Sequence, residues 1–374
     1  MEPTPTNQNR PSPGSPSKPG SSFPRLVLVA LLLAAVLAGF AYEAGWLTPQ
    51  NLTSAKFVKA FVADGASPGF RLNHAKGICI SGTFESNGNG LAICKAAVFG
   101  KGTSTVVGRF SLGGAMPYQA DTSTQVRGLG LQLSAPDGAI WRTAMVNLPV
   151  FPFATPQAFY DMLVASRPDP ATGKPDPAKM QAFFAANPET AAALKIIKAQ
   201  PPAAGFANSS FYSLNAFIFT NAAGVATPVR WIFEPVQSAV TLFSPANDKN
   251  FLFDDLIAQL ARGPLQWHLI LIVGEPGDPT NDATIPWPPT RRRIDAGILT
   301  IDHMQSDDTS PTGLLNFDPL VLPSGIAPSD DPLLSARSAI YSASFTRRSG
   351  ATKAPDAVTP ADIQKIESSN HPGG

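Results

Sequence analysis

A run of 17 residues without a charged side chain limits how this chain can be organised. The run covers residues 26–42, and a helix over it would be about 26 Å long, near the lower limit for a bilayer span. The basic residues Arg10, Lys18 and Arg25 precede the run, which predicts a cytoplasmic N-terminus and an extracytoplasmic remainder. We therefore expect residues 25–46 to be a transmembrane anchor or a cleaved signal segment. The protein would then lie in the periplasm or on the extracytoplasmic face of the inner membrane.

The composition changes along the chain. Residues 1–24 contain seven prolines and few side chains that could enter a core, so we expect a disordered tail. Residues 50–350 are long enough to bury a core and are expected to form the folded domain. Residues 351–374 are polar and are expected to be a flexible tail. Because 28 Lys and Arg residues nearly balance 27 Asp and Glu residues, we exclude the broad basic surface of a nucleic-acid-binding protein.

Apolar segments bounded by turn residues predict a largely antiparallel sheet or barrel. Residues 77–84 and 91–99 flank the turn-rich residues 85–90, which predicts a β-hairpin. Helices are expected where a capping residue precedes a proline, at Thr155, Asp176 and Asn187. A last helix is expected at residues 332–341, which makes the chain an α+β protein. Further strands are expected at residues 105–112, 128–134, 212–220, 227–233, 265–273 and 294–301.

The two cysteines, Cys79 and Cys94, are too far apart in sequence for a CxxC redox or zinc motif. In the predicted hairpin they would face each other across the two strands. An extracytoplasmic location would allow them to oxidise. Two alternatives therefore stay open, a disulfide or a pair of buried thiols.

Three residues have side chains suited to chemistry at a haem. Arg337 and Tyr341 are four residues apart in the last predicted helix and would share one face of it. A guanidinium beside a phenol lowers the pKa of the phenol from about 10, and a phenolate is a strong ligand for ferric haem iron. His74 lies just ahead of the first predicted strand. Taken alone, such a histidine is more often a structural hydrogen-bonding residue than a catalyst.

Six sequence blocks occur in an informative order. They are RLNHAKG (71–77), GRFSL (108–112), RGLGLQL (127–133), NLPVFPF (147–153), TPQAF (155–159) and NFDPLVLPSGIAPSDDPLLSARSAIYSASFTRR (316–348). In order and approximate spacing these blocks resemble the haem catalases. The resemblance is closest to the small catalase-related peroxidases, or minicatalases, which lack the N-terminal arm and C-terminal domains of full-size catalases. It covers about residues 50–350.

The resemblance implies a catalase-like antiparallel β-barrel core with surrounding helices and a haem b cofactor. It implies that His74 is the distal acid–base residue and that Ser111 orients it. It also implies that Tyr341 is the proximal iron ligand, kept ionised by Arg337. The other implied haem contacts are Arg71, Arg109 and Arg348 at the propionates, and Phe151 and Phe159 on the distal side.

Two positions depart from the pattern of full-size catalases. Val146 stands where they carry an asparagine that helps to bind peroxide, and Asn215 stands where they carry a proximal histidine. Because valine cannot donate a hydrogen bond, we expect weak catalase activity. The resemblance therefore predicts a haem peroxidase that reduces hydrogen peroxide or an organic hydroperoxide with electrons from a small organic donor.

Two alternatives to this function stay open. One is a haem-binding or sensing module without turnover, and the other is a catalase-fold enzyme that rearranges hydroperoxides. The expected partners are the peroxide, the organic donor and, through the N-terminal segment, the membrane. A homodimer is an oligomeric state to be tested.

Overall fold

The computed structural model describes residues 23–43, 51–201, 205–238 and 248–370. The chain divides into two compact units, Met1–Thr53 and Ser54–Gly374. In the first unit, helix α1 (Phe23–Glu43) contains the uncharged run, and most of the apolar side chains of the run are exposed. The tail expected at residues 1–24 lies, up to residue 22, outside the described residues.

Among the described residues, no helix is both long and apolar enough to cross a bilayer. The transmembrane alternative for residues 25–46 is therefore not confirmed. The uncharged run of 17 residues reaches about 26 Å as a helix, against about 30 Å of hydrocarbon core.

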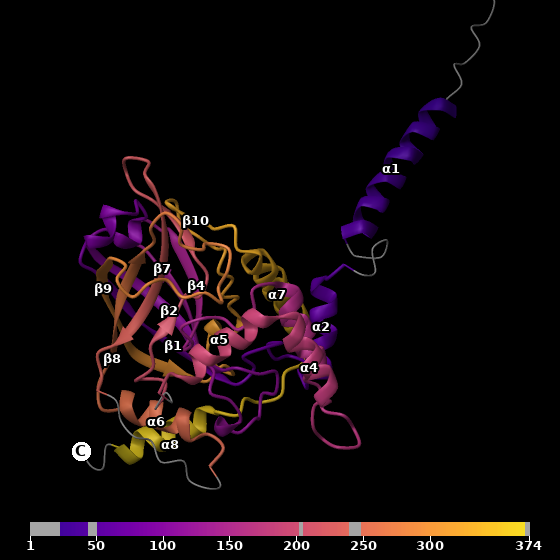
Figure 1. Ribbon diagram of the computed structural model, residues 1–374. Helices are drawn as coiled ribbons and strands as arrows, with labels where there is room; N and C mark the ends of the chain where they lie inside the picture. Colours follow the sequence, from indigo (N-terminus) through magenta and orange to yellow (C-terminus); the bar gives the residue numbers. More distant parts are fainter. Residues whose placement is uncertain (1–22, 44–50, 202–204, 239–247, 371–374) are drawn as a thin grey trace, which may run out of the picture. The chain divides into compact units, whose positions relative to one another are not determined.

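The second unit is built around a closed antiparallel barrel (Figure 1). Going round the barrel, each strand pairs with the next in the order β7, β5, β4, β3, β2, β1, β9 and β8, and β8 pairs with β7 to close the ring of eight. Two short strands, β6 (Phe217–Thr220) and β10 (Ile326–Pro328), continue the sheet outward from β7. The predicted α+β fold with an antiparallel barrel is confirmed. The barrel strands are β1 (Gly77–Ser86), β2 (Gly102–Leu112), β3 (Arg127–Ser134), β4 (Ile140–Val146), β5 (Phe211–Tyr212), β7 (Ala226–Pro235), β8 (Leu265–Val273) and β9 (Arg293–Gln305).

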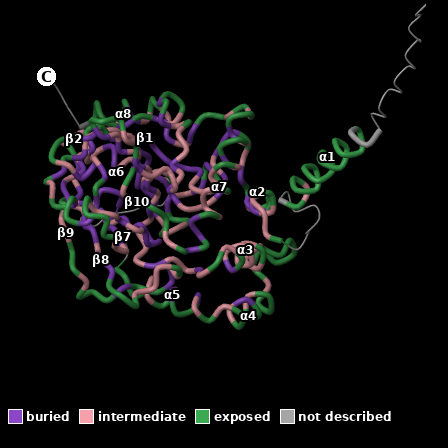
Figure 2. The backbone as a smooth tube through the Cα atoms, turned by 90° about the horizontal axis from the view of Figure 1, so that it is seen from above, coloured by how far each residue is buried: buried purple, intermediate pink, exposed green. Residues whose placement is uncertain are grey.

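Large aromatic side chains fill the interior of the barrel. Along each strand every second side chain points inward, and several of these inward positions are aromatic. Trp141 of β4 packs edge-on against Trp231 of β7, with the ring centres 5.1 Å apart. Phe110 of β2 packs against Trp267 of β8 at 5.8 Å. All four are fully buried, and Figure 2 shows the buried backbone concentrated in this part of the chain. The barrel interior is therefore a packed core.

Seven helices of this unit are described, and their starts largely follow the predicted caps. The side chains of Thr155 and Asp176 accept hydrogen bonds from backbone N–H groups of the first turns of α3 and α4, as expected. The Asn187 side chain instead donates to the carbonyl of Phe183, so it does not cap α5. The helices are α2 (Ser54–Ala63), α3 (Pro156–Ala165), α4 (Pro177–Ala186), α5 (Pro188–Lys198), α6 (Phe251–Leu260), α7 (Pro332–Ser349) and α8 (Pro360–Asn370).

The hairpin predicted around residues 85–90 is wrong. β1 pairs with β2 and β9, and residues 89–92 and 97–99 form short 3-10 helices instead of a strand. The side chains of Ile93, Cys94, Val98 and Phe99 still enter the core. A buried apolar run without a clear period fits a strand and an irregular turn equally well, which explains the error.

The C-terminal region differs from the flexible tail expected at residues 351–374. α7 runs past residue 341 to Ser349, and α8 follows at Pro360–Asn370. Val358 and Ile363 are buried in the main core, and α8 lies against α6 (Figure 1). Residues 371–374 are outside the described part of the chain.

Both cysteines are buried free thiols, so the thiol alternative is confirmed and the disulfide is wrong. Cys79 on β1 donates its S–H to Oδ1 of Asp307 at 3.0 Å, and Cys94 donates to the carbonyl of Gly325 at 3.3 Å. Burial raises the pKa of Cys94 to about 11, and burial together with Asp307 raises the pKa of Cys79 further. Neither thiol is poised to react as a thiolate.

Candidate active site

A cavity lies between one side of the barrel and helices α2, α3 and α7. It holds about 1240 Å³ of space outside atoms, part of it open to solvent. All nine residues that the sequence predicted for the site line this one cavity, although they come from positions as far apart as 71 and 348. They are Arg71, His74, Arg109, Ser111, Phe151, Phe159, Arg337, Tyr341 and Arg348.

His74 is held in a precise position just before β1. Its backbone has a left-handed conformation with φ of 57°, which is uncommon for a residue other than glycine. Its N–H donates to Oδ1 of Asn73 at 2.9 Å, and its ring Nδ1 lies 3.1 Å from Oγ of Ser111 on β2. A Cβ at Gly128 of β3 would lie 2.8 Å from that Nδ1 and 2.7 Å from that Oγ. Glycine in the RGLG block therefore leaves room for the His74–Ser111 pair.

The surroundings of His74 favour its neutral form. Burial, together with the charges of Arg109, Arg337 and Arg71, lowers the pKa of the imidazole to about 4. At neutral pH the ring therefore carries no charge and has one nitrogen free to accept a proton. That is the state that a general base needs before reaction.

Three arginines give one part of the cavity wall an excess of positive charge. Burial and the neighbouring guanidinium groups lower the pKa of Arg71 to about 9 and that of Arg348 to about 10, yet both stay protonated at neutral pH. Nε of Arg348 is buried without a hydrogen-bond partner among the described residues. The third arginine, Arg109, pairs with Asp307. Three cations and one carboxylate leave about two charges uncompensated, which suits a ligand bearing two carboxylates.

Arg109, which was predicted only to contact a haem propionate, makes several hydrogen bonds within the protein. Its Nε donates to Oδ2 of Asp307 at 2.7 Å, and its two Nη atoms donate to the carbonyl oxygens of His74 (2.7 Å) and Ala75 (2.9 Å). Three of its five N–H bonds are therefore used inside the protein. Sequence reasoning missed two of the supporting residues. Asp307 lies in a loop and belongs to none of the six blocks, and Asn73 stands inside the RLNHAKG block but was given no role.

Helix α7 brings Arg337 and Tyr341 to the cavity one turn apart, as predicted from their spacing. Arg337 donates through Nη1 to Oδ1 of Asn215 and through Nη2 to the carbonyl of Ala144 at 2.7 Å. Asn215 in turn donates through Nδ2 to Oδ2 of Asp331 at 2.7 Å, and Asp331 caps the first turn of α7. Asn215 therefore bridges a guanidinium and a carboxylate at the cavity wall, at the position where full-size catalases are expected to carry a histidine.

An aromatic wall faces the cavity from α2 and α3. Phe159 packs against Phe151 at 5.8 Å and against Phe57 and Phe61 of α2 at 5.8 Å and 6.2 Å. Phe151 and Phe159 were predicted to line the site, but Phe57 and Phe61 were not. Their spacing of four residues in an amphipathic helix was the available signal.

Two neighbouring residues at the end of β4, Val146 and Asn147, have side chains that point in different directions. Val146 lines the cavity and presents an apolar side chain there. Asn147 turns away, since its Oδ1 accepts from the backbone N–H of Arg127 at 2.8 Å and its Nδ2 donates to the carbonyl of Gln125 at 3.0 Å. The neighbouring asparagine therefore does not replace the hydrogen-bond donor that Val146 lacks.

These residues fit a haem. The apolar and aromatic walls suit a flat macrocycle, the unpaired Arg348 Nε and the excess charge suit two propionates, and Tyr341 offers a phenol to an iron atom. A Cβ at Gly130 would approach the Phe317 ring to 2.8 Å, so glycine keeps this wall open as well.

Comparisons with known proteins agree with this geometry. The Catalase family model matches residues 66–358. The chain belongs to the catalase family. A catalase-related peroxidase of Synechococcus elongatus is 35% identical over 326 residues, which cover 86% of this chain and 95% of that protein. A catalase-related peroxidase of Mycolicibacterium paratuberculosis is 30% identical, with 82% and 96% covered. Membership places the chain among oxidoreductases that act on peroxide.

Solved structures show the same fold at lower sequence identity. A fungal catalase superposes with a TM-score of 0.67 at 20% identity, over 79% of this chain and 62% of that one. Catalase A from Saccharomyces cerevisiae gives a TM-score of 0.65 at 20% identity, over 78% and 63%. This chain thus spans somewhat less than two thirds of these larger catalases.

Proposed function

We propose that this protein is a haem b-dependent peroxidase with weak catalase activity. The observation that carries the proposal is the single cavity in which a neutral His74 with its Ser111 partner, the Arg337–Tyr341 pair and three arginines come together. The two catalase-related peroxidases that the chain resembles over most of its length support it.

The residues of the cavity divide into holding groups and a proton-transfer group. Tyr341 would bind the iron through its phenolic oxygen, and Arg337 would place a positive charge on the same cavity wall one helical turn away. Arg71 and Arg348, and the remaining N–H groups of Arg109, would hold the propionates. Bound haem would supply the iron that exchanges electrons with peroxide and with the donor.

His74 would move the proton that the reaction requires. The imidazole takes a proton from one peroxide oxygen and returns it to the other, which departs as water or as an alcohol. The overall reaction is ROOH plus two electrons and two protons giving ROH and water, and the organic donor supplies both electrons. For a base at Nε2, Nδ1 must carry the hydrogen and donate it to the hydroxyl oxygen of Ser111, which can accept it.

The apolar distal wall supports a peroxidase over a fast catalase. A catalase must hold and oxidise a second peroxide molecule, whereas Val146 offers that molecule no hydrogen bond and Asn147 points elsewhere. Phe57, Phe61, Phe151 and Phe159 instead offer apolar surface, which suits an organic hydroperoxide.

The direct test is a haem titration followed by a peroxide assay. The haem-loaded protein should oxidise guaiacol in a manner that depends on hydrogen peroxide or on cumene hydroperoxide. Haem binding without donor oxidation would favour the sensing module, and consumption of an unsaturated hydroperoxide without any donor would favour rearrangement.

Location and assembly form separate proposals. We propose that residues 25–46 direct the folded unit to the extracytoplasmic side, on the grounds of the uncharged run and the preceding basic residues. N-terminal sequencing of the protein from fractionated cells distinguishes a retained segment from a cleaved one. Light scattering of the haem-loaded protein distinguishes a homodimer from a monomer.

A further inference from the structure

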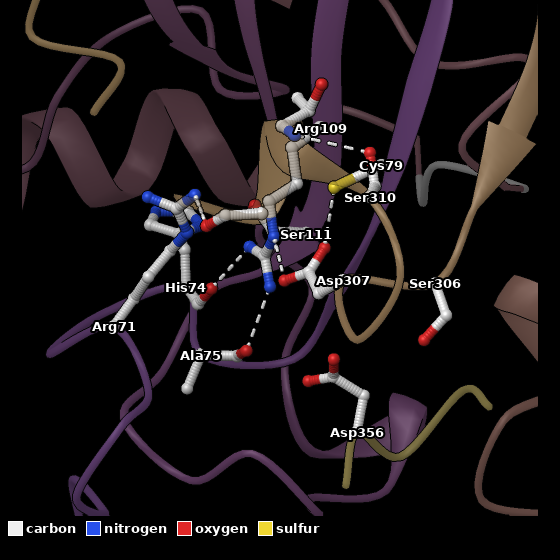
Figure 3. A network of polar contacts seen from close by, with 12 residues as sticks. Arg71, His74, Ala75, Cys79, Arg109, Ser111, Ser306, Asp307, Ser310 and Asp356 are labelled. Atoms are coloured by element: carbon white, nitrogen blue, oxygen red, sulfur yellow. Dashed lines mark hydrogen bonds and ion pairs between the residues drawn. The ribbon is translucent and has the colours of Figure 1, made fainter. Parts of the chain in front are cut away.

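A buried carboxylate outside the cavity wall controls the direction of an arginine inside it. Asp307 lies in the loop just after β9, and its Oδ2 accepts from Nε of Arg109 on β2 at 2.7 Å. Both side chains are almost fully buried, with 3% of Arg109 and 7% of Asp307 exposed. The second oxygen, Oδ1, accepts from the thiol of Cys79 at 3.0 Å (Figure 3). Asp307 is therefore fixed on one side by β1 and fixes Arg109 on the other.

The contact through Nε leaves the two Nη atoms of Arg109 pointing at consecutive backbone carbonyls. They donate to His74 and Ala75 at 2.7 Å and 2.9 Å (Figure 3). The guanidinium is planar and rigid, so fixing Nε also fixes the directions of the other N–H groups. The left-handed backbone of His74 is unfavourable for a residue other than glycine, so it persists only where neighbouring groups hold it. Arg109 supplies two of the contacts that hold it.

Asp307 is also the carboxylate partner for this group of cations. Burial raises its pKa, but Arg109 and Arg71 lower it more, so the net pKa lies below the ordinary value and the carboxylate is ionised at neutral pH. An isosteric amide at this position would leave Arg109 buried beside Arg71 and Arg348 without its counter-charge. The guanidinium would then be free to turn away from the carbonyls and towards any anion in the cavity.

We propose that Asp307 is a positioning residue for proton transfer by His74, acting through Arg109. The proposal rests on the proposed function of His74 as acid–base group. In this proposal Arg109 holds the backbone of His74 and Ala75 in place, in addition to any contact with a bound carboxylate.

The test compares Asp307→Asn with Asp308→Asn in the haem-loaded protein. Asp308 is the adjacent residue, and its carboxylate pairs with Lys353 and accepts from the N–H of Asp356, with no contact to Arg109. Two rates are measured by rapid mixing, the reaction with hydrogen peroxide and the association of cyanide. Cyanide binds as HCN and needs a distal base to remove its proton, so its association rate reports on His74 without turnover.

Asp307→Asn should slow both rates by at least about 10-fold, approaching the ~10²-fold that a displacement of about 1 Å can cost. Asp308→Asn should leave both within twofold of the parent. Equal rates for Asp307→Asn and the parent would overturn the proposal, as would a lowered melting temperature with both rates unchanged. A parent protein that binds haem but does not react with peroxide would instead overturn the proposed function.

A double substitution tests the route through Arg109. Arg109→Lys removes the planar guanidinium, so Asp307 no longer has a guanidinium to orient. The double variant Arg109→Lys with Asp307→Asn should therefore have the same rates as Arg109→Lys alone, within twofold. If the rate reductions of the two single variants multiply in the double variant, Asp307 does not act through Arg109. If Asp307→Asn does not fold, Cys79 gives a milder test: Cys79→Ala should slow cyanide association several-fold because Oδ1 loses its donor, whereas Cys79→Ser should restore the parent rate. Identical rates in the alanine and serine variants would contradict it.

Discussion

The imidazole Nδ1 of His74 lies 3.1 Å from the hydroxyl oxygen of Ser111, with Gly128 providing the space for both. The pair joins the loop before β1 to strand β2, and the opposite ring nitrogen, Nε2, is the one that does not contact Ser111. If this nitrogen is the base, replacing His74 by Ala should leave haem bound and slow the reaction with peroxide by ~10²-fold or more. Ser111→Ala should have a smaller effect, because it removes the contact that orients the imidazole ring but leaves the base itself in place. Rapid mixing with peroxide checks both, and a His74→Ala rate within threefold of the parent would show that another group transfers the proton.

The depressed pKa of His74 makes stability depend on pH in a defined window. The pKa is about 4 in the folded protein, against an ordinary value near 6.5. Between these values the unfolded chain binds a proton that the folded protein does not, so stability falls as the pH drops from about 6.5 to about 4. At pH 5 the loss is roughly 2 kcal/mol by linkage.

Urea unfolding at pH 7 and pH 5 measures this loss. His74→Gln removes the titrating group and should show a smaller decrease between the two pH values than the parent does. An equal decrease in both proteins would place the pH dependence in groups other than His74. Asp254 and Asp356, whose pKa values burial raises to about 6 and about 7, act in the opposite direction, because the folded protein holds their protons more tightly than the unfolded chain does.

Tyr341 should be needed to retain haem. Tyr341→Phe keeps the ring in the cavity and removes the oxygen, so the protein should purify largely without haem or with an altered spectrum. Arg337→Ala should weaken retention less, because it removes a charge from the cavity wall and the contacts to Asn215 and Ala144 but leaves the ligand oxygen in place. An unchanged ferric spectrum in Tyr341→Phe would reject this assignment.

The two cysteines should behave as protected thiols. Because Cys79 and Cys94 are buried and their pKa values are raised, neither should react with a thiol reagent in the folded protein at pH 7. After unfolding without reductant, mass measurement should show two alkylated thiols. If Cys79 and Cys94 stay unalkylated after unfolding and react with the reagent only when reductant is added, they form a disulfide.

The sequence was informative wherever a short segment determines its own structure. Asp176 followed by Pro177 marked the start of α4, and the spacing of Arg337 and Tyr341 placed them on one face of α7. The nine site residues were found because the resemblance supplied positions that no local pattern could connect.

Contacts that form only in three dimensions were beyond sequence reasoning. The partners of β1 are β2 and β9, and the pairing with β9 joins residues more than 200 positions apart, so the local hairpin was the wrong choice. Asp307 and Asn147 show the same limit. The loop after β9 places Asp307 within hydrogen-bond distance of Arg109, and the side chain of Asn147, just after β4, accepts from the backbone N–H of Arg127 on β3. Neither direction can be deduced from residue type.

The ratio of donor oxidation to oxygen release tests the central claim most directly. Val146 removes one hydrogen-bond donor from the cavity, and a single donor at a reacting centre is typically worth ~10²-fold in rate. Both rates should be measured on one haem-loaded preparation of the parent and of Val146→Asn, with hydrogen peroxide and guaiacol. We predict that the parent oxidises the donor and releases little oxygen, and that Val146→Asn raises oxygen release. Rapid oxygen release by the parent with negligible donor oxidation would contradict the account and identify the protein as a short catalase.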